Sequence, residues 1–319
     1  MARVLVSAPL PGAALDRLRA VHDVEVGTDP RGLGHAVLLE RVGPFEALVT
    51  LLSDRIDEAL LTEAPRLRVI ANCAVGVDNI DLAACRARRV VVTNTPDVLT
   101  DATADLTFAL LLAACRRVAE GDRSLRSGVP WRGWSPTELL GVRVTGASLG
   151  IIGLGRIGRA LARRAAGFSM RVSYTQRRRA PEEVERELAA SFVDLERLLA
   201  GSDIVCVCCP LTDETRGLLS RQRLRAMRPG SVLVNTARGA CVEQEALADV
   251  LDEGPLFAAG LDVFEAEPDV PARLRAHPRV VLTPHIASAD RPTRERMADL
   301  CADGVLDVLA GRTPQFLVA

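Results

Sequence analysis

A glycine-rich turn between two apolar runs constrains the fold of this chain more than any other feature. Residues 148–152 form a short apolar run, Gly153, Gly155 and Gly158 follow directly, and residues 159–167 suit a helix. A second apolar run begins at residue 171. Strand, glycine turn, helix and strand in this order predict a dinucleotide site, because the glycines let the backbone approach a pyrophosphate at the helix N-terminus. The alternative is a glycine turn that serves only the backbone.

Composition narrows the functional classes. The 319 residues predict two domains, and a formal charge of −1 with scattered arginines predicts neither a nucleic-acid nor a membrane partner. Every basic side chain is arginine, which excludes a Schiff-base or P-loop lysine. The N-terminus lacks the apolar segment of a signal peptide and no apolar run is long enough to cross a bilayer, so we expect a cytoplasmic protein.

The cysteines and histidines do not form a metal-binding pattern. Cys206, Cys208 and Cys209 lie in the apolar run 203–210, so we interpret them as core residues of a strand rather than as redox or zinc ligands. The four histidines are widely spaced. We therefore predict no metal site.

Strands and helices are expected to alternate twice along the chain, which is typical of parallel α/β sheets. The first alternation has strands at 4–7, 47–51, 69–72 and 90–94, and the second has strands near residues 148, 171, 204, 232, 258 and 280. A helix over 104–121, opened by Thr100 or Asp101, is apolar all round and is expected to be buried. The last helix, 291–309, has no following strand and is assigned to the first domain. We thus expect a discontinuous domain of residues 1–98 and 287–319, and a nucleotide-binding domain of residues 99–286.

Three polar segments at or just after strand ends carry the candidate chemistry. Residues 235–239, 261–268 and 283–288 contribute Arg238, Glu267 and His285. Reduction of a ketone needs a cation for the substrate anion and a proton donor for the developing alkoxide, and a carboxylate beside histidine favours the imidazolium. The alternatives are a surface ion pair for Arg238, a helix-start carboxylate for Glu267 and a core histidine for His285.

Several motifs in order resemble one enzyme family. They are Gly76-Val77-Asp78-Asn79-Ile80-Asp81, Asn94-Thr95-Pro96, the glycine turn, Pro210-Leu211-Thr212, Asn235-Thr236-Ala237-Arg238-Gly239, Gly260-Leu261-Asp262-Val263-Phe264, Glu267-Pro268 and Pro284-His285. From the first strand to the last helix the chain resembles the D-isomer-specific 2-hydroxyacid dehydrogenases, and among them most closely the glyoxylate/hydroxypyruvate reductases. The resemblance implies a Rossmann cofactor domain inserted into a discontinuous, flavodoxin-like substrate domain.

The resemblance also implies residue roles. Arg238 binds the substrate carboxylate and keto oxygen, His285 is the acid/base and Glu267 its partner, while the backbone of Val75 and Gly76 binds the substrate carboxylate. Leu52 and Trp134 are expected to wall a small substrate pocket, which favours glyoxylate or hydroxypyruvate. Asp262 is expected to meet the nicotinamide carboxamide. The other expected cofactor contacts are Gly153, Gly155, Arg156, Ile157, Gly158, Cys209, Pro210, Thr236, Ala237, His285 and Ala287.

Three positions depart from the family pattern. Cys208 stands where many relatives carry a histidine, which alters the adenine side of the pocket. Ala287 replaces a common glycine, and Asp290 stands where threonine or a small residue is usual. These changes leave the reaction type intact and bear on substrate fit.

The residue that ends the second strand of the nucleotide-binding domain predicts the choice of cofactor. An NAD-specific site ends this strand with a carboxylate that binds the ribose hydroxyls. Here Gln176 takes that place and Arg177, Arg178 and Arg179 follow. Guanidinium groups bind phosphate in a bidentate manner, so we expect NADPH first and NADH second. Solvated loop charges are the alternative.

Rival functions and the number of subunits stay open at this point. A phosphite or 3-phosphoglycerate dehydrogenase shares the same cofactor domain, and a nucleotide-sensing corepressor uses the fold as a dimeric binding module. Trp131 and Trp134 lie in a Gly/Pro-rich loop, and together with the apolar helix they predict a homodimer.

Overall fold

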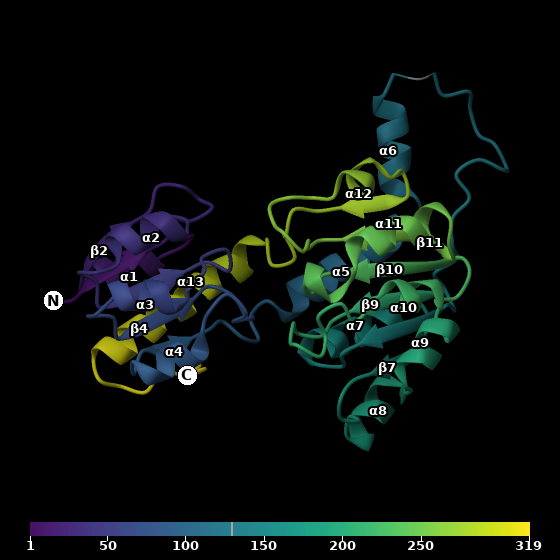
Figure 1. The fold of residues 1–319 in the computed structure, drawn as a ribbon. Helices are drawn as coiled ribbons and strands as arrows, with labels where there is room; N and C mark the ends of the chain where they lie inside the picture. Colours follow the sequence, from purple (N-terminus) through teal and green to yellow (C-terminus); the bar gives the residue numbers. More distant parts are fainter. Residues whose placement is uncertain (129) are drawn as a thin grey trace. The chain divides into compact units, whose positions relative to one another are not determined.

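The computed structural model describes residues 1–128 and 130–319, and the chain divides into two compact units. Unit 1 comprises Met1–Leu99 and Ser288–Ala319, and unit 2 comprises Thr100–Ala287. Val129, in the Gly/Pro-rich loop of the two tryptophans, lies outside the described residues. Both units carry buried apolar clusters on the two faces of a parallel sheet. Figure 1 shows the strands and helices of each unit as a ribbon.

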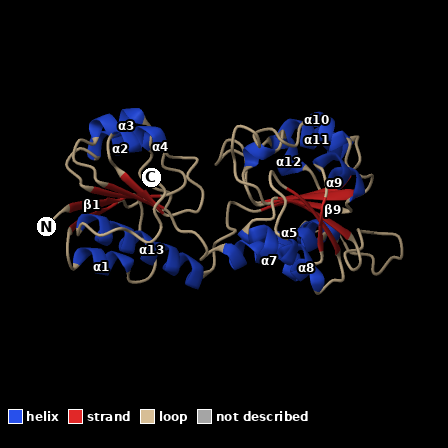
Figure 2. Ribbon diagram, turned by 90° about the horizontal axis from the view of Figure 1, so that it is seen from below, coloured by secondary structure: helices blue, strands red, loops and turns tan. Residues whose placement is uncertain are grey.

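Unit 1 is built on a five-stranded parallel sheet with the order β2-β1-β3-β4-β5. Its strands are β1 (Arg3–Val6), β2 (Asp23–Val26), β3 (Ala47–Thr50), β4 (Val69–Asn72) and β5 (Val91–Thr93). Its helices are α1 (Ala14–Arg19), α2 (His35–Arg41), α3 (Glu58–Glu63), α4 (Leu82–Ala87) and α13 (Arg291–Leu309). Figure 2 shows α1 and α13 on one face and α2, α3 and α4 on the other. Helix α13 packs on β3 and β4, so a segment far along the chain covers one face of the first sheet.

Unit 2 is built on a seven-stranded parallel sheet with the order β12-β11-β10-β9-β6-β7-β8. The strands are β6 (Ser148–Ile152), β7 (Arg171–Thr175), β8 (Ala190–Phe192), β9 (Ile204–Val207), β10 (Ser231–Asn235), β11 (Leu256–Leu261) and β12 (Val280–Leu282). The helices are α5 (Thr100–Cys115), α6 (Val118–Arg126), α7 (Arg156–Ala166), α8 (Glu182–Leu188), α9 (Leu195–Gly201), α10 (Arg221–Arg225), η1 (Gly239–Cys241), α11 (Gln244–Asp252) and α12 (Ala272–Ala276). Helices α5, α7 and α8 cover one face and α9 to α12 the other (Figure 2).

The strand order of unit 2 reverses at β6, which pairs with both β7 and β9. The glycine turn follows β6, at the switch point where open parallel sheets bind their ligands. The two doubly wound parallel sheets confirm the predicted fold class, with Rossmann and flavodoxin-like domains.

Two strands and one helix boundary differ from the sequence prediction. β2 and β8 were not predicted, because these short edge strands are partly exposed and lack a continuous apolar run. The single helix over 104–121 is wrong: α5 ends at Cys115, and Arg117 takes a left-handed conformation (φ 54°) before α6 begins. Helix α5 is largely buried as predicted, whereas no residue of α6 is buried.

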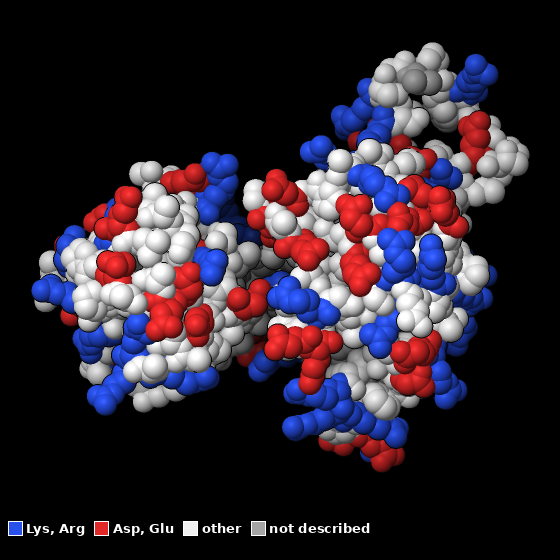
Figure 3. Space-filling model, viewed as in Figure 1, with Lys and Arg blue, Asp and Glu red and all other residues white. Residues whose placement is uncertain are grey.

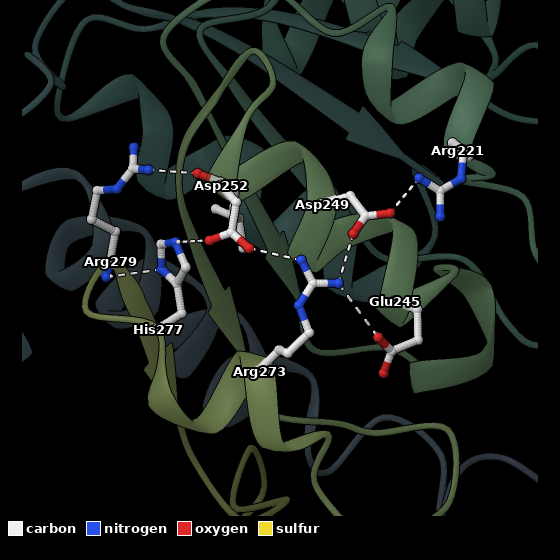
Figure 4. Close-up of polar contacts among 8 residues, drawn as sticks. Arg221, Glu245, Asp249, Asp252, Arg273, His277 and Arg279 are labelled. Atoms are coloured by element: carbon white, nitrogen blue, oxygen red, sulfur yellow. Dashed lines mark hydrogen bonds and ion pairs between the residues drawn. The ribbon is translucent and has the colours of Figure 1, made fainter.

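An ion-pair network joins the helices beside β12 (Figure 4). Arg273 of α12 contacts Asp249 and Asp252 of α11 at 2.6 and 2.7 Å. His277 lies 3.5 Å from Asp252, and its Nδ1 accepts the N–H of Arg279, so the ring is held neutral. Burial, followed by the Arg279 charge, lowers the pKa of His277. The network therefore anchors the start of β12, the strand that leads to His285.

Charged side chains are interspersed on the face of the molecule seen in Figure 3. Acidic and basic groups alternate over both units in this view, as a formal charge of −1 suggests. Within the described residues, no helix has the length and apolar character needed to cross a membrane.

Candidate active site

Glu267 and His285 form a hydrogen-bonded pair in unit 2. The turn after β11 carries Glu267, whose Oε1 accepts the N–H of Phe264 at 2.9 Å. Its Oε2 lies 2.7 Å from Nδ1 of His285. A carboxylate accepts and does not donate, so Nδ1 carries the proton of this bond and Nε2 is left for another partner. The His285 side chain is 24% exposed, which leaves the ring accessible.

The surroundings keep Glu267 ionised. Burial, the largest single cause, raises the pKa of this carboxyl, and the hydrogen bond and charge of His285 oppose it. The N–H of Phe264 and the charge of Arg238 act in the same direction, and the net pKa is lowered. Glu267 therefore presents a negative charge to the imidazole at neutral pH.

Arg238 is placed near this pair by a tight turn after β10. The Asn235 side chain accepts the N–H of Ala237 at 3.0 Å and donates to the carbonyl of Arg238 at 2.9 Å, which closes the turn. A Cβ at Gly239 would overlap the backbone of Phe264, so glycine allows the Arg238 turn to approach the turn that carries Glu267. The structure thus brings Arg238, Glu267 and His285 into one electrostatic cluster.

Asp262 anchors the loop that carries His285. Its Oδ1 accepts the hydroxyl of Thr283 at 2.6 Å and the N–H of Ile286 at 2.8 Å, and its Oδ2 accepts the N–H of Ala287 at 2.9 Å. His285 has a left-handed backbone (φ 52°) and donates its N–H to the carbonyl of Asp262 at 2.9 Å. Burial raises the pKa of Asp262, and these donors partly offset the shift. The loop conformation depends on this carboxylate.

This geometry corrects the expected role of Asp262. The side chain was expected to contact the nicotinamide carboxamide, but the residue has no exposed surface and both of its oxygens accept protein donors. Ala287 is likewise buried, with its N–H held by Asp262. Thr236 is 7% exposed. The hydroxyl of Thr107 donates to the carbonyl of Thr103, so it acts as the acceptor for the Thr236 hydroxyl, 2.6 Å away. These buried residues hold the backbone of the candidate site in place.

The glycines of the turn after β6 have three different roles. Gly153 has φ 99°, and a Cβ there would lie 2.9 Å from the backbone nitrogen of Cys209. A Cβ at Gly158 would overlap the carbonyl of Gly153, so this glycine lets α7 pack on the turn. Gly155 has no atom within 4 Å of its Cβ position, which leaves open space over the first turn of α7, where Arg156 and Ile157 lie. Open space at a helix N-terminus fits a pyrophosphate.

Gln176 takes the place of the strand-end carboxylate. Its Oε1 accepts the N–H of Leu154 at 2.9 Å, and its Nε2 donates to the carbonyl of Arg178 at 2.7 Å. The amide therefore connects the glycine turn to the arginine segment. Arg178 is exposed, and Arg177 is exposed and lies 3.7 Å from Glu214.

Arg179 differs from the two arginines before it. It binds Glu185 through Nε at 2.9 Å and Nη2 at 2.7 Å, and the hydroxyl of Tyr174 donates to the same carboxylate at 2.7 Å. The bond to Arg179, followed by that to Tyr174, lowers the pKa of Glu185 to about 2. Arg179 therefore pairs with Glu185 near the start of α8 while its side chain is 65% exposed, and its binding to a cofactor phosphate stays a prediction.

The remaining predicted contacts lie in different surroundings. In unit 1, Leu52 is 38% exposed, and Val75 and Gly76 are partly exposed on the loop after β4. In unit 2, Trp134 is 85% exposed and does not wall a pocket of that unit. Cys209 is buried, and Pro210 after it is exposed.

Cys208, the departure on the adenine side, is partly exposed next to the end of β9. Burial raises the pKa of its thiol to about 12, so the side chain is uncharged at neutral pH. It contributes no charge to the neighbourhood of the glycine turn. Asp290, the third departure, caps α13 by accepting the N–H of Thr293 at 2.8 Å.

Sequence reasoning missed the roles of three asparagines of unit 1. Asn72 ends the apolar run of β4 and is fully buried, whereas Asn79 and Asn94 are partly exposed and lie within the family motifs. A polar residue that closes a buried strand was the available signal, because a buried amide must find partners.

Comparison with known proteins identifies the family. Residues 108–287, more than half of the chain, match the NAD-binding domain of the D-isomer-specific 2-hydroxyacid dehydrogenases. The chain therefore belongs to this dehydrogenase family, as its motifs indicated, and the matched domain is one that binds a nicotinamide cofactor.

Individual relatives extend the match over the full chain. A glyoxylate reductase of Pyrococcus horikoshii is 48% identical over 99% of this chain and 95% of its own. The crystal structure of the TT0316 protein of Thermus thermophilus has a TM-score of 0.92 at 50% identity, covering 99% of this chain and 100% of that one. A third match is an NADPH-dependent glyoxylate/hydroxypyruvate reductase of Sinorhizobium meliloti, solved with NADP and malonate. It has a TM-score of 0.84 at 31% identity, and the match covers 100% of this chain and 97% of that one.

Proposed function

We propose that this protein reduces small 2-oxo acids, glyoxylate first and hydroxypyruvate second, to D-2-hydroxy acids with NADPH, and that His285 donates the proton. The observation that carries the proposal is the 2.7 Å bond between Glu267 and Nδ1 of His285, with Arg238 close enough to act on the charge of Glu267. The glyoxylate reductase of Pyrococcus horikoshii, which is 48% identical over 99% of this chain, supports the choice of substrate.

The described residues fit a nicotinamide dinucleotide. The open space over Gly155 and the start of α7 suit the pyrophosphate, with Arg156 and Ile157 beneath it and Pro210 at the neighbouring strand end. When bound, the reduced nicotinamide supplies the hydride that the carbonyl carbon receives. Thr236, Ala237, Asp262 and Ala287 support this region through their buried contacts.

The protein's own groups account for binding and proton transfer. Arg238 pairs with the substrate carboxylate and polarises the keto oxygen, while the N–H groups of Val75 and Gly76 bind the same carboxylate. The proton on Nε2 of His285 moves to the keto oxygen as negative charge develops there, leaving a neutral imidazole. Glu267 stabilises the imidazolium before transfer and fixes the orientation of the ring. Leu52 is a further proposed substrate contact.

The preference for NADPH over NADH rests on the end of β7. A carboxylate here would repel a 2′-phosphate, whereas Gln176 is neutral and its amide holds the backbone of Arg178. We assign the phosphate to Arg177, Arg178 and Arg179, the last of which also pairs with Glu185. The Sinorhizobium meliloti relative, named as NADPH-dependent, supports this assignment.

We also propose that the protein is a cytoplasmic homodimer. Large apolar side chains are exposed along one segment of unit 2: Val118, Leu125, Trp131, Trp134, Leu139 and Leu140. Their exposed fractions run from 47% to 85%, and exposed apolar side chains concentrated in one segment mark a contact with another protein. An exposed Trp134 fits this contact better than a pocket wall in its own chain.

A substrate panel tests the proposed reaction. Purified protein is mixed with NADPH or NADH and with glyoxylate, hydroxypyruvate, 3-phosphohydroxypyruvate or no acid, and the loss of nicotinamide absorbance is followed; phosphite oxidation is followed in the reverse direction with NADP or NAD. We expect the highest kcat/KM with NADPH and glyoxylate. A higher value with the phosphorylated acid or phosphite would replace the proposal by one of the rival dehydrogenases. Tight cofactor binding without turnover of any acid would indicate the nucleotide-sensing class.

A further inference from the structure

The loop after β4 has three successive carbonyl groups held by donors from within unit 1. The carbonyl of Ala74 accepts the N–H of Thr95 at 2.9 Å. The carbonyl of Val75 accepts Nδ2 of Asn94, and that of Gly76 accepts Nδ2 of Asn72, each at 2.8 Å. Two of the three donors are side-chain amides, and the third is the backbone N–H of Thr95.

These bonds determine where the N–H groups of the same peptide units point. A trans peptide is planar, and its N–H points opposite to its C=O. The N–H groups of Val75, Gly76 and Val77 therefore point away from Thr95, Asn94 and Asn72, and within the described residues no protein acceptor takes them. All three residues are partly exposed. Partly exposed N–H groups without a protein acceptor are available to bind an anion.

Asn72 is itself held in one orientation. The residue is fully buried, and its Oδ1 accepts the hydroxyl of Thr50 at 3.0 Å. Exchange of its amide oxygen and nitrogen would place an oxygen against the carbonyl of Gly76, so this network assigns Nδ2 to the loop. Nδ2 of Asn79 donates to the carbonyls of Leu51 and Asp54 at 3.2 and 3.0 Å, which ties the loop after β3 to the same cluster.

We propose that Asn72 and Asn94 are positioning residues, whose neutral amides hold the Val75 and Gly76 carbonyls so that the loop's N–H groups face the substrate carboxylate. The inference rests on the proposed function in assigning a 2-oxo acid to this loop. An amide suits the task because it donates to a carbonyl without bringing charge near an anion. An aspartate at either position would repel both the carbonyl and the substrate.

Asn94→Asp tests the proposal, because Asn94 is partly exposed and the change keeps the side-chain shape. Loss of a hydrogen bond that acts on a charged ligand corresponds to about a ten- to hundredfold effect. We therefore expect the KM for glyoxylate to rise by that factor, with kcat and the Kd of NADPH within about twofold of wild type. Asn94→Ala, which removes the donor without adding charge, is expected to raise the KM less.

Thr62→Val is the control for a general loss of stability in unit 1. Its hydroxyl donates within α3 to the carbonyl of Glu58, remote in sequence from the loop. The hydroxyl also accepts a bond from Arg88 at 3.0 Å, so we expect this variant to lower Tm slightly without changing the KM for glyoxylate. If Asn94→Asp lowers Tm but leaves the KM unchanged, the asparagine is merely structural and the proposal is overturned.

A binding measurement separates this inference from the proposed reaction. Oxalate, a non-reducible dicarboxylate, is titrated into ¹⁵N-labelled protein with NADP, and the amide resonances of Val75 and Gly76 are followed. Shifts in the wild type that require about tenfold or more oxalate in Asn94→Asp support the positioning role, even if no 2-oxo acid is turned over and the proposed reaction fails. Unchanged amide shifts in the wild type, or equal affinities in the two proteins, overturn the inference, whatever the substrate panel shows.

Discussion

At the scale of single residues, the hydrogen bond from His285 to Glu267 is the feature on which the proposed chemistry depends. Burial opposes ionisation of Glu267, yet the imidazole, the Phe264 N–H and the Arg238 charge together lower its pKa. Since the folded pKa lies below the ordinary value of 4.5, the ionised pair contributes to stability above about that pH. This contribution is lost as the pH falls through the folded pKa.

Glu267→Gln keeps the shape of the side chain and removes its charge. A neutral amide carries no charge to pair with the ring that donates the proton, so proton transfer to the keto oxygen should slow. We expect kcat/KM for glyoxylate at pH 7.5 to drop by about 10- to 100-fold. Steady-state kinetics measure this drop, with Glu265→Gln as the control for loss of one exposed carboxylate. An unchanged kcat/KM in Glu267→Gln would show that the carboxylate does not support the histidine.

Gln176→Asp tests the cofactor assignment. A carboxylate at the end of β7 repels the 2′-phosphate and accepts hydrogen bonds from the ribose, so the preference for NADPH should weaken. We expect the ratio of kcat/KM for NADPH to that for NADH to fall by about tenfold or more, as the loss of one favourable contact suggests. Arg178→Ala should lower the same ratio. A ratio that stays constant in both variants would contradict the assignment.

The clustering of Arg238, Glu267 and His285 was easier to predict than the contacts around them. Arg238, Glu267 and His285 stand in polar segments after strands, and parallel strand ends meet at one edge of a sheet. The engagement of Arg179 by Glu185 and the burial of Asp262 were not predicted, because their partners lie 6 and 21 to 25 residues away. Partners of this kind depend on tertiary packing rather than on local pattern.

At the scale of elements, the 283–287 loop is held by one buried side chain. Asp262→Asn replaces an oxygen by an NH₂ group that faces a donor, which leaves a buried polar group unpaired. We expect the free energy of unfolding to fall by about 1–3 kcal/mol. At about 2–4 °C per kcal/mol, calorimetry should resolve the lower Tm. The kcat should fall as well, since His285 lies within this loop.

Asp269→Asn is the matched control for the Asp262 prediction. Asp269 is exposed in the same connection between β11 and α12, so the change should leave both Tm and kcat near wild type. Equal stability of Asp262→Asn and Asp269→Asn would show that the buried carboxylate does not hold the loop.

The elements themselves were predictable where apolar runs were continuous. The central strands β3, β4, β9 and β10 are buried throughout and were predicted to within a few residues. The break between α5 and α6 was not predicted. It depends on Arg117, which takes a left-handed conformation and is held by Glu120 at 2.7 Å. The edge strand β2 alternates apolar and charged residues and lacks a continuous apolar run.

At the scale of the whole molecule, the exposed apolar segment of unit 2 predicts self-association. Light scattering should give twice the chain mass of 34.2 kDa. Leu125→Glu with Leu140→Glu places two charges in the proposed contact and should shift the protein toward the chain mass, whereas Val21→Glu, at a similarly exposed residue of unit 1, should not. A wild-type protein that stays at 34.2 kDa at micromolar concentration would contradict the homodimer.

The central claim is that His285 transfers the proton during reduction of a 2-oxo acid, and the turnover of His285→Ala tests it most directly. With glyoxylate and NADPH, the account predicts a fall in kcat of about 10²- to 10⁴-fold, while the Kd of NADPH stays within about twofold because the glycine turn is untouched. A variant that binds NADPH normally and still turns over at a near wild-type rate would contradict the account.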